Sequence, residues 1–177
     1  MRYRRSRVSG GTFFFTANLA DRNYRLLTEH VGMLREVTRT VRQRHSFEIV
    51  AMVVLPDHLH AVWTLPPGDR NYPMRWSLIK AGFSRVIMKT EPVSESHVCK
   101  RERGVWQRRY WEHQIRNEDD LARHVDYIHF NPVKHGHVKS PVEWPYSSIH
   151  RYIRKGFVSF DWGMDIAADE SGFGERE

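Results

Sequence analysis

The stretch FEIVAMVVLPDHLHAVWTL, residues 47–65, predicts two β-strands joined by a tight turn. Its first half is apolar except for one glutamate, and Pro56 and Asp57 then supply turn-forming residues before a second extended run begins. Side chains alternate between the two faces of a strand, so His58 and His60 share one face of the second strand. We therefore expect a β-hairpin that carries two imidazoles on the same side.

The segments on either side of this hairpin predict further strands and helices. Before it, residues 13–16 have the aromatic and β-branched character of a buried strand, and apolar residues then recur at helical spacing from residue 25 to about 43. After it, apolar residues within 76–87 predict a second helix. Residues 106–111 are rich in aromatic side chains and fit either a short strand or an ordered loop. The predicted order is strand, helix, hairpin, helix.

A further helix is predicted to begin at Asn117, which is a favourable N-cap residue followed by three acidic residues. We expect this helix to end near Asn131, because the residue before a proline, here Pro132, is disfavoured in helical geometry. Tyr127 and Asn131 are four residues apart and therefore neighbours on one side of the helix.

The composition predicts one globular domain, since the chain has 177 residues, of which 40% are hydrophobic and 28% charged. We place that domain at residues 1–164, with a basic N-terminal arm, and expect residues 165–177 to form a disordered acidic tail. The net charge of +7 indicates a polyanionic partner. A single cysteine, Cys99, favours a reducing cytoplasm, and no apolar run is long enough to span a membrane.

The His58 and His60 pair has two interpretations, either metal ligands or hydrogen-bonded structural residues. Two imidazoles and a lone cysteine are too few for a closed structural zinc site. An open divalent site is the alternative, in which an amide or carboxylate oxygen joins the imidazoles and a substrate phosphate completes the shell. This donor set suits Mn²⁺, and Mg²⁺ less well. The second such pair, His135 and His137, flanks a glycine in a predicted loop and is the weaker candidate for a ligand site.

A tyrosine can act as the nucleophile in phosphodiester chemistry, and two tyrosines are candidates. Tyr127 has Asn131 one helical turn away, whose amide oxygen could complete a metal shell. Tyr110 is the second candidate, within the basic aromatic segment 106–111. Both tyrosines also fit ordinary core packing.

Arginines alternate with aromatic residues in three places, a pattern typical of proteins that stack unpaired bases and hold phosphates. These places contain the predicted DNA contacts Arg4, Arg5, Arg75, Arg108 and Arg109. The pattern favours single strands or loops over plain duplex as the ligand.

Four motifs together resemble the single-tyrosine HUH (His-hydrophobic-His) transposases of the IS200-like family, and most closely their REP-associated tyrosine transposase branch. The resemblance covers about residues 3–162, and its motifs are GGTFFFT at 10–16, VLPDHLH at 54–60, WQRRYWEH at 106–113 and HVDYIHFNPVKHG at 124–136. It implies an α+β, HUH nuclease fold, a ferredoxin-like or RRM-like antiparallel sheet with helices packed on one side.

The resemblance also implies roles for individual residues. His58 and His60 correspond to the metal ligands, Tyr127 to the nucleophile, and Asn131 to a third ligand where related enzymes have glutamine. The implied reaction is cleavage and rejoining of single-stranded DNA through a 5′-phosphotyrosine, with Mg²⁺ or Mn²⁺ as cofactor.

The implied substrate is REP DNA, an extragenic palindrome that folds into a hairpin preceded by a short guide sequence. We expect the segment Gly10, Gly11, Thr12 to approach this strand closely, because glycines admit a nearby backbone. The chain is expected to act as a monomer or homodimer. Two other functions stay open, a non-catalytic hairpin-binding module and a zinc-type hydrolase that uses His58, His60 and Asp57.

Overall fold

The computed structural model describes residues 9–90 and 105–164. Arg4, Arg5 and the predicted tail at 165–177 lie outside these residues. Within the described part of the chain, no helix is long and apolar enough to cross a membrane.

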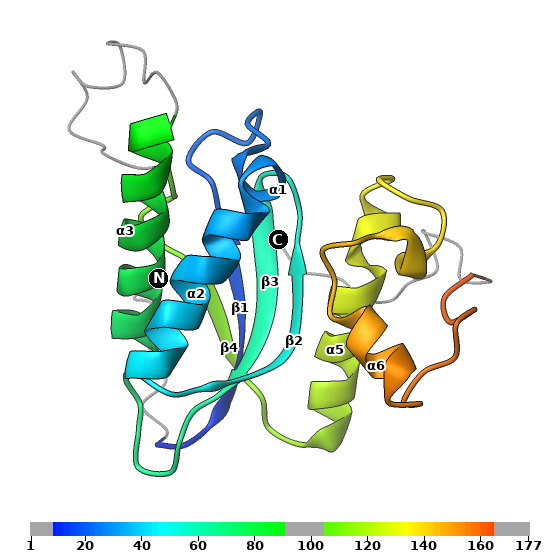
Figure 1. Ribbon diagram of the computed structural model, residues 1–177. Helices are drawn as coiled ribbons and strands as arrows, with labels where there is room; N and C mark the ends of the chain where they lie inside the picture. Colours follow the sequence, from blue (N-terminus) through cyan, green and yellow to red (C-terminus); the bar gives the residue numbers. More distant parts are fainter. Residues whose placement is uncertain (1–8, 91–104, 165–177) are drawn as a thin grey trace, which may run out of the picture.

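Four antiparallel strands form one sheet in the order β2-β3-β1-β4 (Figure 1). The strands are β1 Thr12–Asn18, β2 Glu48–Val54, β3 His58–Thr64 and β4 Trp111–Gln114. The predicted hairpin is confirmed as β2 and β3, and the aromatic segment 106–111 leads into β4 at its last residue. In the register between β1 and β3, Thr16 lies opposite His60. This strand order is the ferredoxin-like arrangement that the resemblance implies.

The first face of the sheet is covered by α2 Val31–Arg44 and α3 Tyr72–Thr90 (Figure 1). The helix predicted from residue 25 is interrupted, because His30 leaves helical geometry between α1 Leu26–Glu29 and α2. The two long helices approach closely at Gly82, where a Cβ would come within 2.6 Å of a Val37 methyl group.

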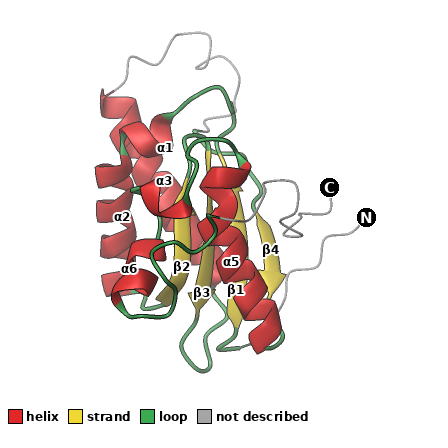
Figure 2. Ribbon diagram, turned by 90° about the vertical axis from the view of Figure 1, so that its right-hand side faces the viewer, coloured by secondary structure: helices red, strands yellow, loops and turns green. Residues whose placement is uncertain are grey.

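The opposite face of the sheet is covered by α5 Glu118–Lys134, which lies across the strands in Figure 2. Helices therefore cover both faces, which corrects the expectation of helices on one side only. The reason is that the strands are apolar on both faces: Phe14, Val53 and Val62 point away from the first core and pack against α5.

Helix α5 begins as predicted, with the Asn117 side chain accepting a hydrogen bond from the backbone N–H of Asp120 at 2.8 Å. The predicted end at Asn131 is wrong, because the helix continues through Pro132 to Lys134. A proline in the last turn removes a single intrahelical hydrogen bond, and both Asn131 and Pro132 are buried. Tertiary packing outweighs the local preference here.

The short helix α6 Ile149–Arg154 follows the 3₁₀ turn Pro141–Glu143, and a buried histidine joins this region to α5. His129 Nε2 lies 2.9 Å from Ser148 Oγ, and this hydroxyl in turn accepts a hydrogen bond from the backbone N–H of Met52 at 2.9 Å. Burial lowers the pKa of His129 to about 3.

Replacement of His129 by glutamine should make the protein less sensitive to acid. The folded-state pKa lies below the unfolded value, so the unfolded chain binds the extra proton and stability falls as the pH drops below about 6.5. Each pH unit between the two pKa values corresponds to about 1.36 kcal/mol. His129 should therefore lower the free energy of unfolding by ~3 kcal/mol between pH 6.5 and 4. Urea unfolding of the wild type and His129→Gln at both pH values measures this. Equal losses in the two proteins would contradict the assignment.

Candidate active site

His58 and His60 lie side by side on the face of β3 that α5 covers. Their ring centroids are 5.0 Å apart, and both residues are buried. The predicted alternation is confirmed, because Leu59 and Ala61 point into the core on the other face.

Each imidazole is held through its Nδ1 atom. His60 Nδ1 lies 2.8 Å from Thr16 Oγ1 on the neighbouring strand, and His58 Nδ1 donates to Asp57 Oδ1 at 2.7 Å. An imidazole held at Nδ1 presents Nε2 as its ligating nitrogen. The two rings are therefore oriented as metal-binding histidines usually are.

Asp57 orients His58 and is itself held by Arg22. Its Oδ1 accepts from His58, and its Oδ2 accepts from Arg22 Nε at 2.6 Å. Burial alone would raise the pKa of Asp57, but the hydrogen bonds from Arg22 and His58 hold it below its usual value. Asp57 thus fixes the His58 ring and pairs with the Arg22 guanidinium, and the zinc-type hydrolase stays a prediction.

Tyr127 reaches the histidine pair from α5. Its ring centroid lies 5.0 Å from that of His60 and 5.8 Å from that of Phe14, and the residue is 8% exposed. Lys134 places its Nζ 5.1 Å from the centre of the Tyr127 ring. One chain thus brings the candidate nucleophile, the imidazoles and a cationic group together.

Asn131 lies one helical turn after Tyr127 and is fully buried. Neither its Oδ1 nor its Nδ2 has a hydrogen-bond partner among the described residues, and the same holds for His60 Nε2. Buried polar atoms are nearly always paired, so these atoms require an explanation. Two imidazole nitrogens and an amide oxygen fit a partly hydrated divalent cation.

His135 is a residue whose place near the pair the sequence did not indicate. Its ring centroid lies 5.1 Å from that of His58, and burial together with the nearby His58 lowers its pKa to about 4. Tyr127, Asn131 and His135 follow one another at four-residue spacing, and this helical register was the signal that could have found it. Tyr127 contacts His60 and His135 contacts His58, and the helical register puts the intervening Asn131 on the same side of α5 as these two residues.

Comparison with known proteins identifies the family. The family model described as Transposase IS200 like matches residues 15–131, and a REP-associated tyrosine transposase of Escherichia coli (strain K12) is 44% identical over 170 residues, covering 96% of this chain and 95% of that protein. The chain belongs to the REP-associated tyrosine transposases. The resemblance seen in the four motifs is confirmed, and so is the expectation of an enzyme.

Two further comparisons support this membership. A putative REP-associated tyrosine transposase of Haemophilus influenzae is 43% identical over 162 residues, covering 91% of this chain and 92% of that protein. A solved structure of a REP-associated tyrosine transposase bound to a REP hairpin superposes with a TM-score of 0.80 at 44% identity, covering 94% of this chain and 93% of that one.

Tyr110 of this transposase lies on the other face of the sheet from the histidine pair. Its ring packs 6.0 Å from that of Phe15 and 5.7 Å from that of Trp76, within the core beneath α2 and α3. The structure therefore does not bring the second candidate nucleophile to His58 and His60.

The predicted role of Arg75 in DNA binding needs correction. Arg75 is 2% exposed, and its guanidinium donates to Asp69 Oδ2 at 2.5 Å and to the backbone oxygens of three other residues. It ties the start of α3 to the loop before β2 and offers no surface to a ligand. Arg108 and Arg109 are exposed, as a DNA contact requires.

At two positions of the segment Gly10, Gly11, Thr12, the fold itself explains why that residue type is present. Gly10 has φ +71°, and a Cβ there would lie 3.0 Å from the Cα of Pro67. Thr12 Oγ1 lies 2.9 Å from Thr64 Oγ1 across the strands. Contact of this segment with DNA stays a prediction.

Proposed function

We propose that this transposase is a metal-dependent single-stranded DNA endonuclease and strand transferase that acts on REP-type hairpin DNA through a 5′-phosphotyrosine intermediate. The observation that carries the proposal is the contact between the Tyr127 and His60 rings, 5.0 Å apart, beneath a helix that also buries Asn131. A nucleophile is useful only within reach of the groups that activate its target.

In this proposal His58, His60 and Asn131 hold Mg²⁺ or Mn²⁺. The bound ion supplies Lewis-acid polarisation of the scissile phosphate. The Tyr127 oxygen attacks phosphorus and loses its proton, while the bond from phosphorus to the 3′-oxygen breaks and that oxygen takes up a proton. The phosphodiester energy is retained in the phosphotyrosine, so the reverse attack by a 3′-hydroxyl rejoins strands without ATP.

The proposed partner is single-stranded DNA folded into a REP-type hairpin. Support comes from the 44% identical relative, whose structure is that of a complex with a REP hairpin. We also propose that a monomer suffices for cleavage, because Tyr127 contacts His60 of its own chain. We also propose that this activity takes place in the cytoplasm.

Labelled single-stranded hairpin DNA, incubated with the protein and Mn²⁺, tests this function. A covalent protein–DNA adduct that survives denaturation supports the transposase reaction. Binding without cleavage would instead indicate the hairpin-binding module, and cleavage without an adduct would indicate a hydrolase that uses water.

Loss of the Thr16 hydroxyl should weaken metal binding without removing a ligand. In Thr16→Val the His60 ring loses its partner at Nδ1, and changes to such orienting groups cost about 10- to 100-fold in metal affinity. Calorimetric titration with Mn²⁺ measures the effect. Thr12→Val, on the same strand but paired with Thr64, is the control and should bind normally. Equal affinities in the two variants would argue against the proposed ligand set.

The double variant Arg108→Ala and Arg109→Ala should bind hairpin DNA more weakly and with a flatter salt dependence. Each phosphate contact to a single strand contributes about 0.7 to the slope of log K against log salt, so the slope should fall by ~1.4. Arg4→Ala and Arg5→Ala are predicted to act in the same way. Arg39→Ala on α2, whose partner is Glu36, is the control. An unchanged slope would remove these arginines from the interface.

A further inference from the structure

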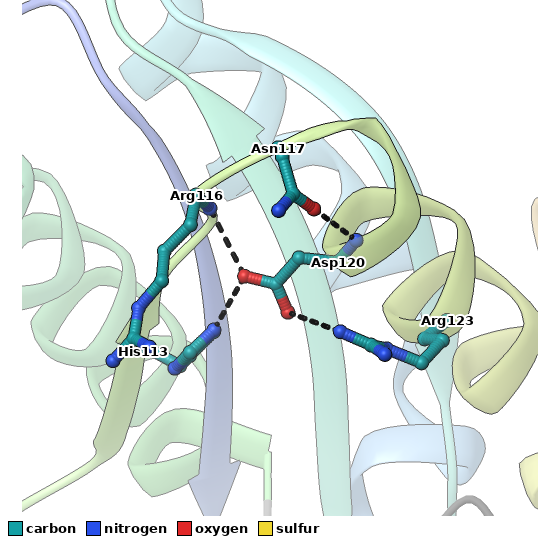
Figure 3. Close-up of a pocket in the computed structure, with 5 residues that line it drawn as sticks. All are labelled: His113, Arg116, Asn117, Asp120 and Arg123. Atoms are coloured by element: carbon teal, nitrogen blue, oxygen red, sulfur yellow. Dashed lines mark hydrogen bonds and ion pairs between the residues drawn. The ribbon is translucent and has the colours of Figure 1, made fainter.

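A second cluster of metal-ligating side chains lies where β4 leads into α5. It consists of His113, Asp120 and His124, each of which offers one ligand atom, and these atoms all lie within 4.8 Å of one another. Figure 3 shows the Asp120 carboxylate between His113, which approaches from the strand, and the Arg123 side chain. None of the three belongs to the proposed catalytic centre.

Each histidine of this cluster lies at a metal-shell distance from one oxygen of Asp120, and His113 also hydrogen-bonds there. His113 Nε2 lies 2.9 Å from Asp120 Oδ2, and His124 Nδ1 lies 3.2 Å from Asp120 Oδ1. When metal–ligand bonds are ~2.1 Å long, neighbouring ligand atoms lie ~2.9–3.4 Å apart. Two imidazoles and one carboxylate are a donor set that first-row divalent metals prefer.

An open pocket of about 730 Å³ adjoins the cluster and is lined by His113, Arg116, Asn117, Asp120 and Arg123. It offers room for water molecules to complete the coordination of an ion. Three protein ligands with open positions are typical of accessible metal sites.

Carboxylates at the start of α5 lie close to two guanidinium groups, because Arg116 and Arg123 line the pocket together with Asp120. Glu118, Asp119 and Asp120 place three carboxylates in the first turn of α5. Burial alone would raise the pKa of Asp120, but hydrogen bonds from His113 and the Arg116 backbone hold it below its usual value, so this carboxylate is ionised. The Arg123 side chain is 68% exposed and lies 3.9 Å from Asp120, a distance at which it can turn into solvent.

We propose that His113, Asp120 and His124 form a second site for a divalent transition metal, which ties β4 to the first turns of α5. On binding, the proton on His113 Nε2 moves to Nδ1 of that ring, and the proton that His124 Nδ1 donates to the Asp120 backbone oxygen moves to Nε2; a proton leaves where both nitrogens of a ring carry one. His124 is three residues before Tyr127, and the Phe14 ring contacts both His124 and His60. An ion here would therefore hold the part of α5 that positions Tyr127.

Zn²⁺ titration of the chelator-treated full-length protein, followed by calorimetry, tests the site without any activity measurement. The wild type should bind two ions per chain. The double variant His113→Gln and His124→Gln should retain one, and His58→Ala with His60→Ala should retain the other. His45→Gln, outside both clusters, should still bind two. Loss of an ion only in the His58 variant would support the proposed catalytic centre alone.

The inference is overturned if the double variant at His113 and His124 binds as many Zn²⁺ ions as the wild type. The cluster would then be a hydrogen-bonded support for α5. If circular dichroism shows that the double variant does not fold, His124→Gln alone decides. Loss of a group that only orients a ligand lowers metal affinity about 10- to 100-fold. Loss of the ligand His124 itself should therefore lower the affinity for one of the two ions by at least that factor. Unchanged affinity would refute the site.

Discussion

Tyr127→Phe should abolish the covalent adduct with hairpin DNA while leaving hairpin binding intact. The substitution removes one oxygen, and the ring contacts with His60 and Phe14, 5.0 and 5.8 Å between centroids, can persist. Loss of a covalent nucleophile in other enzymes costs about 10³-fold or more in rate. Denaturing electrophoresis of labelled DNA measures the adduct, and a gel-shift assay measures binding.

Tyr110→Phe is the matched control for this experiment. It removes the same atom from a tyrosine that packs on Phe15 and Trp76 at the opposite face of the sheet. We expect adduct formation at the wild-type rate. If Tyr110→Phe lost the adduct and Tyr127→Phe kept it, the nucleophile would be misassigned.

His60→Ala should remove metal-dependent cleavage, with an expected loss of about 10³-fold in rate. His60 is fully buried, and its Nε2 lacks a hydrogen-bond partner among the residues that the structure describes. A neutral imidazole in this position suits a cation, and burial lowers the pKa of His60 well below its usual value. Cleavage measured across a Mn²⁺ titration, together with hairpin binding, tests this.

The control for this second experiment separates metal loss from damage to the fold. His60→Gln keeps a polar side chain opposite Thr16, so it should fold like the wild type and still lose cleavage. Removal of metal from the wild type by a chelator should have the same effect, reversed by added Mn²⁺. Full cleavage by His60→Gln in the presence of chelator would overturn the proposed metal centre.

Local pattern accounts for the elements of this fold. The hairpin at 47–65 follows from two apolar runs around a turn, and the shared face of His58 and His60 follows from strand alternation. The start of α5 follows from the capping chemistry of Asn117. Each of these features depends only on residues close together in the chain.

Two predictions from local sequence are wrong because tertiary packing outweighs the local preference. Asn131 was expected to end a helix, but its burial with Pro132 against the sheet carries α5 one turn further. Arg75 has the composition of a DNA contact, yet its guanidinium is enclosed by backbone oxygens from the loop before β2. Spacing along the chain cannot show which side of a residue will be covered.

Sequence reasoning was enough to identify the residue types of the proposed chemistry: two imidazoles on one strand face, and a phenol and an amide on one helix face. Only the fold brings these side chains together. Strands β1 and β3 are apolar on both faces, so α5 has to cover the second face of the sheet, where the two imidazoles lie. The orienting groups were also decided there, since Thr16 is 44 residues from His60 and Arg22 is 35 residues from Asp57. Hydrogen bonds are short in range, so partners this distant in the chain become neighbours only once the strands have paired.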